Sequence, residues 1–131
     1  MLTRRVFAGC ALCAVAGLLA TGADAQSPGF TRTIIKQTDG PIDGYVTVEV
    51  RVDIEPGAEI ARHTHPGIES SYVVEGGTEV TVDGVGAHMY AAGEGWQIPT
   101  GVPHSGKNGP AKTIVATTYV VEKGKPLVSP A

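Results

Sequence analysis

The chain has 131 residues, of which 42% are hydrophobic and 18% are charged, and its formal net charge is −3 at pH 7. This length suffices for one domain and is too short for two ordinary ones. A small acidic chain without runs of Lys or Arg lacks the electrostatic pattern of proteins that bind nucleic acid or anionic lipid, so we expect no nucleic-acid partner.

The first 25 residues show the three-part pattern of a cleavable export signal. A short basic opening contains Arg4 and Arg5, an apolar run covers residues 6–20, and Ala23-Asp24-Ala25 offers a cleavage site. The apolar run is shorter than the roughly 20 residues that a membrane-spanning helix needs. We therefore expect a signal peptide at 1–25, a periplasmic or extracellular protein, and no stable membrane insertion after cleavage. An uncleaved membrane anchor is the alternative.

The paired arginines also bear on the export route. The run Thr3-Arg4-Arg5-Val6-Phe7 resembles the twin-arginine motif, whose pathway carries folded proteins, so a metal could be bound before export. An ordinary export signal with two adjacent arginines explains the same residues equally well. By either route, cleavage after Ala25 would remove Cys10 and Cys13. The mature chain would then have no disulfide, no cysteine metal ligand and no cysteine nucleophile.

Residues 26–122 have the pattern of one all-β domain. The chain contains 18 Gly and 9 Pro, and these punctuate short segments rich in Val, Ile, Thr and Tyr. In Tyr45–Ile54 apolar and polar residues alternate, which places the apolar side chains on one buried face of a strand. Further strands are expected at residues 31–37, 59–63, 70–75, 79–82, 95–98 and 113–121. Many short strands joined by turns predict a sandwich or barrel, followed by a flexible tail at 123–131.

Three histidines and a glutamate stand at spacings that suit one metal site. His63 and His65 are two residues apart, so in a strand both would point to the same face. Glu69 follows after a short turn, and His104 must arrive from another part of the barrel. Three imidazoles and a carboxylate would be costly to desolvate together without a partner for their lone pairs. A divalent transition metal, whether Fe, Mn, Ni, Zn or Cu, would be such a partner, and four protein ligands leave up to two positions open on an octahedral ion.

Two blocks of sequence, separated by 16 residues, fit the two motifs of the cupin superfamily at every defining position. These positions are Gly57, His63, His65, Glu69 and Gly76 in the first block and Gly93, Pro99, Gly101, His104 and Asn108 in the second. The chain thus resembles a small single-domain cupin over residues 57–108. The resemblance implies a single jelly-roll β-barrel in which the three histidines and Glu69 bind the metal.

The resemblance leaves two functions open. The leading hypothesis is a metal-dependent, dioxygenase-type oxidoreductase that acts on a small organic molecule, with catalytic residues beyond the metal ligands unknown. Tyr72, Trp96 and Gln97 are the candidate pocket residues, although Tyr72 and Trp96 would also serve as ordinary barrel filling and Gln97 could face water. The alternative is a non-catalytic module that binds a small molecule or the metal itself. A homodimer could form through residues 31–37 or Tyr45–Ile54 if either is an edge strand.

Overall fold

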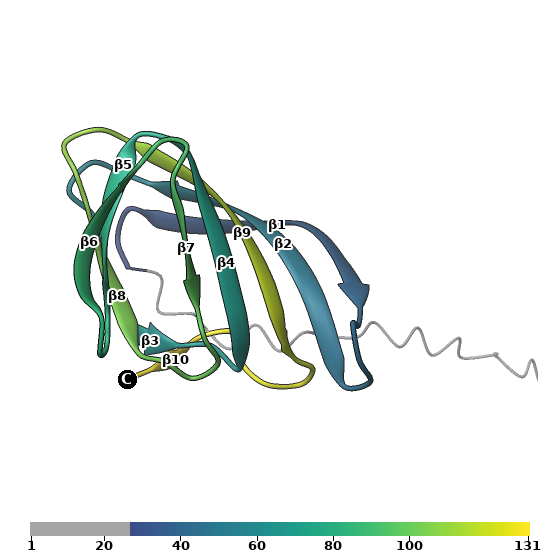
Figure 1. Ribbon diagram of the computed structural model, residues 1–131. Helices are drawn as coiled ribbons and strands as arrows, with labels where there is room; N and C mark the ends of the chain where they lie inside the picture. The colour runs from purple at the N-terminus through teal and green to yellow at the C-terminus, as the bar shows by residue number, and fades with distance from the viewer. Residues whose placement is uncertain (1–26) are drawn as a thin grey trace, which may run out of the picture.

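The computed structural model describes residues 27–131, which form ten strands joined by turns and loops (Figure 1). They are β1 Phe30–Asp39, β2 Tyr45–Ile54, β3 Glu59–Thr64, β4 Gly67–Glu75, β5 Gly77–Val82, β6 Gly86–Ala91, β7 Gly95–Ile98, β8 His104–Asn108, β9 Thr113–Glu122 and β10 Ser129–Pro130. The expected signal segment, with Cys10 and Cys13, lies outside the described residues. Within residues 27–131 there is no helix of the length and hydropathy needed to cross a membrane.

The strands form two antiparallel sheets, which confirms the predicted all-β barrel. One sheet has the order β1-β2-β9-β4-β7 and the other the order β10-β3-β8-β5-β6. Figure 1 shows β3, β8 and β6 on the left of the molecule and β1, β2 and β9 on the right. The chain passes from one sheet to the other at every link between consecutive strands except β1–β2 and β5–β6. Residues near these crossings therefore come together from both sheets.

The core lies between the sheets and is built largely from the alternating strand that the sequence predicted. The inward residues of β2 are between 1% and 5% exposed, while Glu49 and Arg51 between them are exposed. Those inward residues are Val46, Val48, Val50, Val52 and Ile54. Alternate residues of β9, including Val115 and Tyr119, complete the same cluster. Burial of each such aliphatic side chain contributes about 1.5–3 kcal/mol, so this face contributes much of the stability of the barrel.

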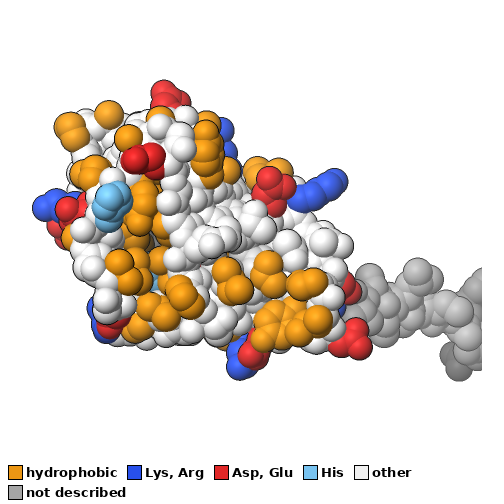
Figure 2. All heavy atoms as spheres, viewed as in Figure 1, with side chains coloured by type: hydrophobic (Ala, Val, Ile, Leu, Met, Phe, Trp, Pro, Cys, Tyr) orange, Lys and Arg blue, Asp and Glu red, His pale blue; other side chains and the backbone are white. Residues whose placement is uncertain are grey.

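Strand β2 is not an edge, which corrects one of the two expected dimer surfaces. It pairs with β1 on one side and with β9 on the other, so neither of its sides is free. The edge of this sheet is β1, which contains the other candidate segment, residues 31–37. Its Ile34 and Ile35 are 52% and 56% exposed. Figure 2 shows hydrophobic side chains reaching the surface in several places on the visible face, with charged side chains scattered between them.

Three observed strands, β6, β8 and β10, were not expected from the sequence. Strand β6 is exposed along almost its whole length, so it lacks the apolar alternation of a half-buried strand. Strand β8 has the sequence HSGKN, which contains no β-branched or large apolar residue. Strands β6 and β8 form because each pairs with one side of β5.

The segment 123–131 is attached to the barrel, which differs from the flexible tail expected there. Ser129 and Pro130 of β10 pair with Thr64 and His63 of β3, and Leu127 packs against the core cluster. A strand of two residues has no periodicity that sequence inspection could detect. Its position depends on an unpaired edge of β3, which lies far away in the sequence.

Two residues of the motif blocks have clear structural roles. The buried side chain of Asn108 donates hydrogen bonds to the carbonyls of Ile54, Glu55 and Ala111, and its Oδ1 accepts one from Thr113. It therefore ties together two loops at one end of the barrel. Gly76 has φ +82°, and a Cβ there would collide with the backbone at Thr113, so only glycine suits this turn.

Candidate metal centre

Four buried side chains converge between the sheets, and they are the four that the sequence singled out. His63 and His104 are cross-strand partners on β3 and β8, whereas Glu69 comes from β4 in the opposite sheet. His65 lies one residue beyond the end of β3, in the link that carries the chain to β4. One potential ligand atom from each residue lies within 4.8 Å of the others, and the residues are only 3–6% exposed. The cluster therefore spans both sheets.

The ring orientations of all three histidines are fixed by main-chain carbonyls. His63 Nδ1 lies 2.7 Å from the Ala61 carbonyl oxygen, His104 Nδ1 lies 3.0 Å from that of Val102, and His65 Nδ1 lies 2.7 Å from that of Leu127. A carbonyl oxygen can only accept, so each Nδ1 must carry the hydrogen and donate it. In the neutral rings the lone pair is then on Nε2. This arrangement, in which the second nitrogen is held by a backbone acceptor, is typical of metal-binding histidines.

The Nε2 atoms of two histidines have no hydrogen-bond partner although they are buried. His65 Nε2 lies 2.9 Å and His104 Nε2 lies 3.3 Å from Glu69 Oε2, yet neither pair has the geometry of a hydrogen bond. With the hydrogens on Nδ1, lone pairs of three acceptors face one another at these distances, which is unfavourable unless a cation lies between them. Ligand atoms around one transition metal ion stand about 3–4 Å apart, because each metal–ligand bond is roughly 2.0–2.2 Å long.

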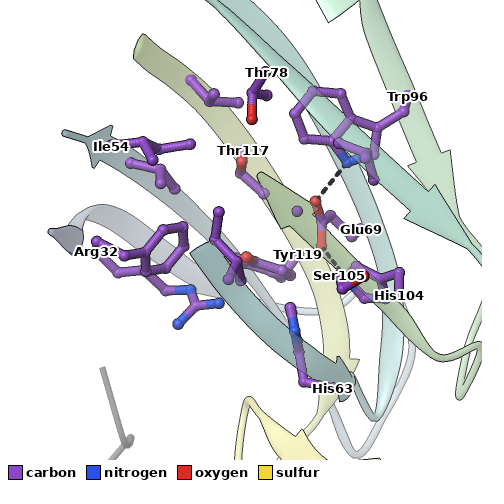
Figure 3. Close-up of a pocket in the computed structure, with 16 residues that line it drawn as sticks. Arg32, Ile54, His63, Glu69, Thr78, Trp96, His104, Ser105, Thr117 and Tyr119 are labelled. Atoms are coloured by element: carbon purple, nitrogen blue, oxygen red, sulfur yellow. Dashed lines mark hydrogen bonds and ion pairs between the residues drawn. The ribbon is translucent and has the colours of Figure 1, made fainter. Parts of the chain in front are cut away.

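The carboxylate of Glu69 is divided between two tasks. Its Oε1 accepts hydrogen bonds from Ser71 Oγ and Trp96 Nε1, both at 2.8 Å. Ser71 Oγ is in turn 2.8 Å from Thr117 Oγ1 on β9. The other carboxylate oxygen of Glu69, Oε2, faces His65 and His104 (Figure 3). The hydrogen bonds at Oε1 thus fix the carboxylate so that a single oxygen points into the cluster.

The electrostatics of the cluster favour a neutral His63 beside an ionised Glu69. Burial is the main cause that lowers the pKa of His63 to about 4; the charges of His104 and His65 act in the same direction, and the hydrogen bond to Ala61 opposes them. Burial alone would raise the pKa of Glu69, but His104 and His65 hold it well below its usual range. Neutral imidazole and ionised carboxylate are the forms that bind a metal. The donor set therefore fits a divalent transition metal ion.

A cavity of about 50 Å³ adjoins the cluster inside the barrel. His63, Glu69 and His104 lie in its wall, so an ion held by these residues would border the cavity. The rest of the wall is mostly apolar, with hydroxyl groups at intervals and one cationic side chain, Arg32 (Figure 3). The wall comprises Phe30, Arg32, Val52, Ile54, Ile60, His63, Glu69, Thr78, Val80, Trp96, His104, Ser105, Gly106, Val115, Thr117 and Tyr119.

Of the three candidate pocket residues, the structure brings only Trp96 to the cluster. Trp96 lines the cavity and donates to Glu69. Tyr72 is 52% exposed on the outer face of β4, because Glu69, Ser71 and Val73 take the inward positions of that strand. Gln97 is also exposed, and its amide donates to Ser70 Oγ. Tyr72 and Gln97 border an open hollow on the outside of the sheet and not the cavity.

Sequence reasoning missed four residues around the cluster. Ser71 and Thr117 support Glu69, the Leu127 carbonyl holds His65, and Arg32 lies in the cavity wall. Ser71 could have been found, since it is two residues from Glu69 and so shares its strand face. The other three come from β1, β9 and the segment after β9, and nothing in their local sequence relates them to the motif blocks.

Comparison with known proteins identifies the fold and matches the region of the cluster. The family model described as the cupin domain matches residues 50–125, which include all four clustered residues. Among solved structures, an RmlC-like cupin from Shewanella frigidimarina is 28% identical with a TM-score of 0.60, over 73% of this chain and 79% of its own. No curated protein matches the sequence.

Two further solved structures are enzymes by name. A polyketide cyclase from Streptomyces resistomycificus is 21% identical with a TM-score of 0.64, over 81% of this chain and 73% of its own. The DMSP lyase DddQ from Ruegeria pomeroyi is 18% identical with a TM-score of 0.68, over 86% of this chain and 54% of its own. At these identities the likeness concerns the fold alone.

Proposed function

We propose, from the premise that this chain belongs to the cupin domain family, that it is a metal-dependent oxidoreductase of the dioxygenase type acting on a small organic molecule. His63, His65, Glu69 and His104 would hold one divalent transition metal ion. Fe(II) and Mn(II) suit both this mixed imidazole and carboxylate donor set and chemistry with O₂. When bound, such an ion supplies redox chemistry and a positive charge that attracts an oxygen-containing ligand.

The observation that carries this proposal is the position of the cavity. Three of the four residues that would hold the ion lie in its wall, so an ion held there would adjoin a space that a small substrate can occupy. A purely structural site would be closed on all sides by protein ligands. The surrounding apolar side chains would exclude water, and Trp96 and Ser71 would keep one Glu69 oxygen away from the substrate.

A non-catalytic binding module is the second candidate, and one observation favours it. Glu69 is the only carboxylate in the cavity wall among the described residues, and it is already engaged by Ser71, Trp96 and two histidines. No separate carboxylate is therefore at hand as a general acid or base. Dioxygenase chemistry at a metal can proceed without one, but lyase or cyclase chemistry usually requires proton transfer. The named enzymes among the similar structures make that third class worth including in the test.

The experiment is to load the protein separately with Fe(II), Mn(II), Ni(II) and Zn(II) and measure oxygen uptake with small organic acids, dicarbonyls and catechols. We expect one metal ion per chain and substrate-dependent oxygen uptake with Fe(II) or Mn(II) only. Turnover that continues without oxygen would replace the proposal by lyase or cyclase chemistry. Tight ligand binding with no turnover under any metal would favour the binding module.

The ligand assignment is tested by His104→Ala, which removes one of the two unpartnered Nε2 atoms. We expect metal content, measured by elemental analysis, to fall from about one ion per chain to a small fraction, because both loss of a ligand and loss of geometry weaken binding. The matched control is His88→Ala, since His88 is exposed on β6 and outside the cluster. Circular dichroism checks that both variants fold. Full occupancy in His104→Ala would remove this residue from the site.

We also propose that the protein acts outside the cytoplasm, as residues 1–25 indicate. Mass spectrometry of protein from fractionated cells tests this directly. A mature chain that begins at Gln26 in the exported fraction is the expected result, and a full-length chain in the cytoplasm would contradict it.

A further inference from the structure

Arg32 is an arginine without an ionic partner, and it lies in the wall of the cavity beside the metal cluster. Arg32 as a whole is half-buried, but its Nε atom is fully buried and has no hydrogen-bond acceptor among the described residues. The other two arginines in residues 27–131 behave differently: Arg51 pairs with Asp53, and Arg62 pairs with Asp83. Both of those pairs are on the surface. Of the three arginines in the described part of the chain, the one at the cavity is thus the one without an ion pair.

The guanidinium of Arg32 is held in place by an aromatic ring. Its Cζ lies 4.5 Å from the ring centroid of Phe30, which is buried and also lines the cavity. This cation–π contact offers no hydrogen-bond acceptor to the guanidinium, and Nε has no acceptor elsewhere in residues 27–131. Figure 3 shows the group on the side of the pocket where His63 lies, across from Trp96 and Thr78. The contact with Phe30 therefore holds the cation at the cavity without satisfying its Nε donor.

A stack that merely packs the barrel does not account for the buried Nε. Lysine, methionine or leucine would fill the same space without burying a donor that has no acceptor. An edge of N–H groups in a planar fork is the shape that recognises a carboxylate through two parallel hydrogen bonds. The charges in the cavity wall also favour an anionic ligand. A bound divalent ion and Arg32 would together carry more positive charge than the single negative charge of Glu69 balances.

The cavity has room for a small ligand. One bound water needs about 10–15 Å³ of such space, so a cavity of about 50 Å³ holds roughly three to five water-sized groups. A short carboxylic acid is of this size. The apolar side chains Val52, Ile54 and Val115 would contact its carbon atoms.

We propose that Arg32 is the specificity-determining residue of this site and that the ligand is a short-chain carboxylate. Its carboxylate binds the edge of the Arg32 guanidinium, and its other end lies toward His63, Glu69 and His104. That this other end reacts at the metal rests on the function proposed above. The anion site at Arg32 does not depend on that function.

The experiment is an NMR titration of Zn(II)-loaded protein, and in parallel of metal-free protein, with propionate and with its neutral analogue propionamide. We expect the Arg32 Nε–Hε resonance to shift saturably with propionate in both forms and not to shift with propionamide. Arg32→Gln should weaken propionate binding about tenfold or more, which is the effect of losing a charge-assisted pair of hydrogen bonds. Arg51→Gln, which removes a surface arginine, should leave it unchanged.

The outcomes separate this proposal from the metal proposal. Failure of the wild-type protein to bind one Zn(II) would count against the metal site, while the metal-free titration would still decide on Arg32. Equal propionate affinity in Arg32→Gln and wild type, or an equal response to propionamide, would overturn the anion site. If Arg32→Gln does not fold, the wild-type Nε–Hε titration decides by itself, and absence of a propionate shift there would also overturn the proposal.

Discussion

At the scale of single residues, the neighbours Ser70 and Ser71 show how a strand separates roles. Ser71 points inward and donates to Glu69 Oε1, whereas Ser70 points outward and accepts from Gln97. The two side chains are chemically identical, but only one of them reaches the cluster. This alternation gives a matched pair of substitutions for testing what the hydrogen bonds to Glu69 contribute.

We predict that Ser71→Ala weakens metal binding by about 10–100-fold, which is the usual effect of removing a group that orients a ligand. Ser70→Ala should leave the affinity unchanged. Competition with a chromophoric chelator measures both. Equal affinities in the two variants would mean that Trp96 alone is sufficient to fix the carboxylate.

The depressed pKa of His63 predicts a pH dependence for the metal-free protein. The pKa of His63 is about 4 in the folded state and about 6.5 in an unfolded chain, so between these values the unfolded chain takes up a proton that the folded protein does not. Stability therefore falls as the pH drops from about 6.5 to about 4. The contribution of this one group is at most about 3 kcal/mol.

Urea unfolding of the chelator-treated protein at pH 7 and pH 4.5 measures this loss. His63→Gln cannot titrate, so it should lose less stability than the wild type over the same interval. The difference between the two proteins isolates His63 from the carboxylates that also titrate at low pH. An identical loss in both would show that His63 is protonated in the folded state.

Residue spacing predicted the four clustered side chains, but it did not predict the other groups that surround them. His63, His65, Glu69 and His104 stand in motif blocks whose spacing has a direct geometric meaning. Arg32 and the Leu127 carbonyl reach the site through strand pairing over long sequence distances, and neither has a local pattern. Tyr72 and Gln97 were placed near the site by sequence proximity, but strand alternation turns their side chains to the outside.

At the scale of strands and loops, Gly67 shows why β4 can begin where it does. A Cβ at this residue would overlap the backbone of Val120, so the start of β4 lies directly against β9. Glu69 follows two residues later. This close approach helps place the carboxylate opposite the histidines of the other sheet, and any side chain at this position would force β4 away from β9.

The loop tie at Asn108 gives a prediction at this scale. Asn108→Ala removes the hydrogen bonds that this side chain makes and leaves the carbonyls of Ile54, Glu55 and Ala111 without its N–H groups. We expect it to lower the free energy of unfolding by about 2–4 kcal/mol without removing the metal ligands. Gln97→Ala, which removes an exposed amide, should change it by less than about 0.5 kcal/mol. Chemical denaturation of both variants is the measurement.

Sequence patterns predicted strands with apolar alternation or many β-branched residues and missed strands that lack both. The alternation of β2 was visible because its inner face is buried along its whole length. Strands β6 and β10 have little buried apolar surface, and β8 is made of polar residues and glycine. Such strands are held by backbone pairing to a neighbour, and backbone pairing depends little on side-chain identity.

At the scale of the whole molecule, the proposed metal ion would join the two sheets. Three of its ligands belong to β3, β8 and the link after β3, while Glu69 belongs to β4 in the other sheet. Binding to the folded state alone adds about 2.7 kcal/mol of stability when the free metal concentration is 100 times its dissociation constant. Metal removal should therefore affect the entire barrel.

We predict that a chelator lowers the midpoint of thermal unfolding by roughly 10 °C or more, as expected for a loss of this size in a domain of about 100 residues. Differential scanning calorimetry with and without chelator measures the shift. His104→Ala should show no shift, because it has little metal to lose. A wild-type midpoint that does not respond to chelator would argue against a metal shared by the two sheets.

The use of main-chain carbonyls at Ala61, Val102 and Leu127 has a consequence for how this protein can evolve. Point mutations do not delete a backbone acceptor, so the imidazole tautomers can survive extensive sequence drift as long as the path of the chain is kept. Adaptation to a different ion or a new compound would instead act through the side chains around Glu69 and Arg32, where a single codon change can alter chemistry without disturbing the histidines.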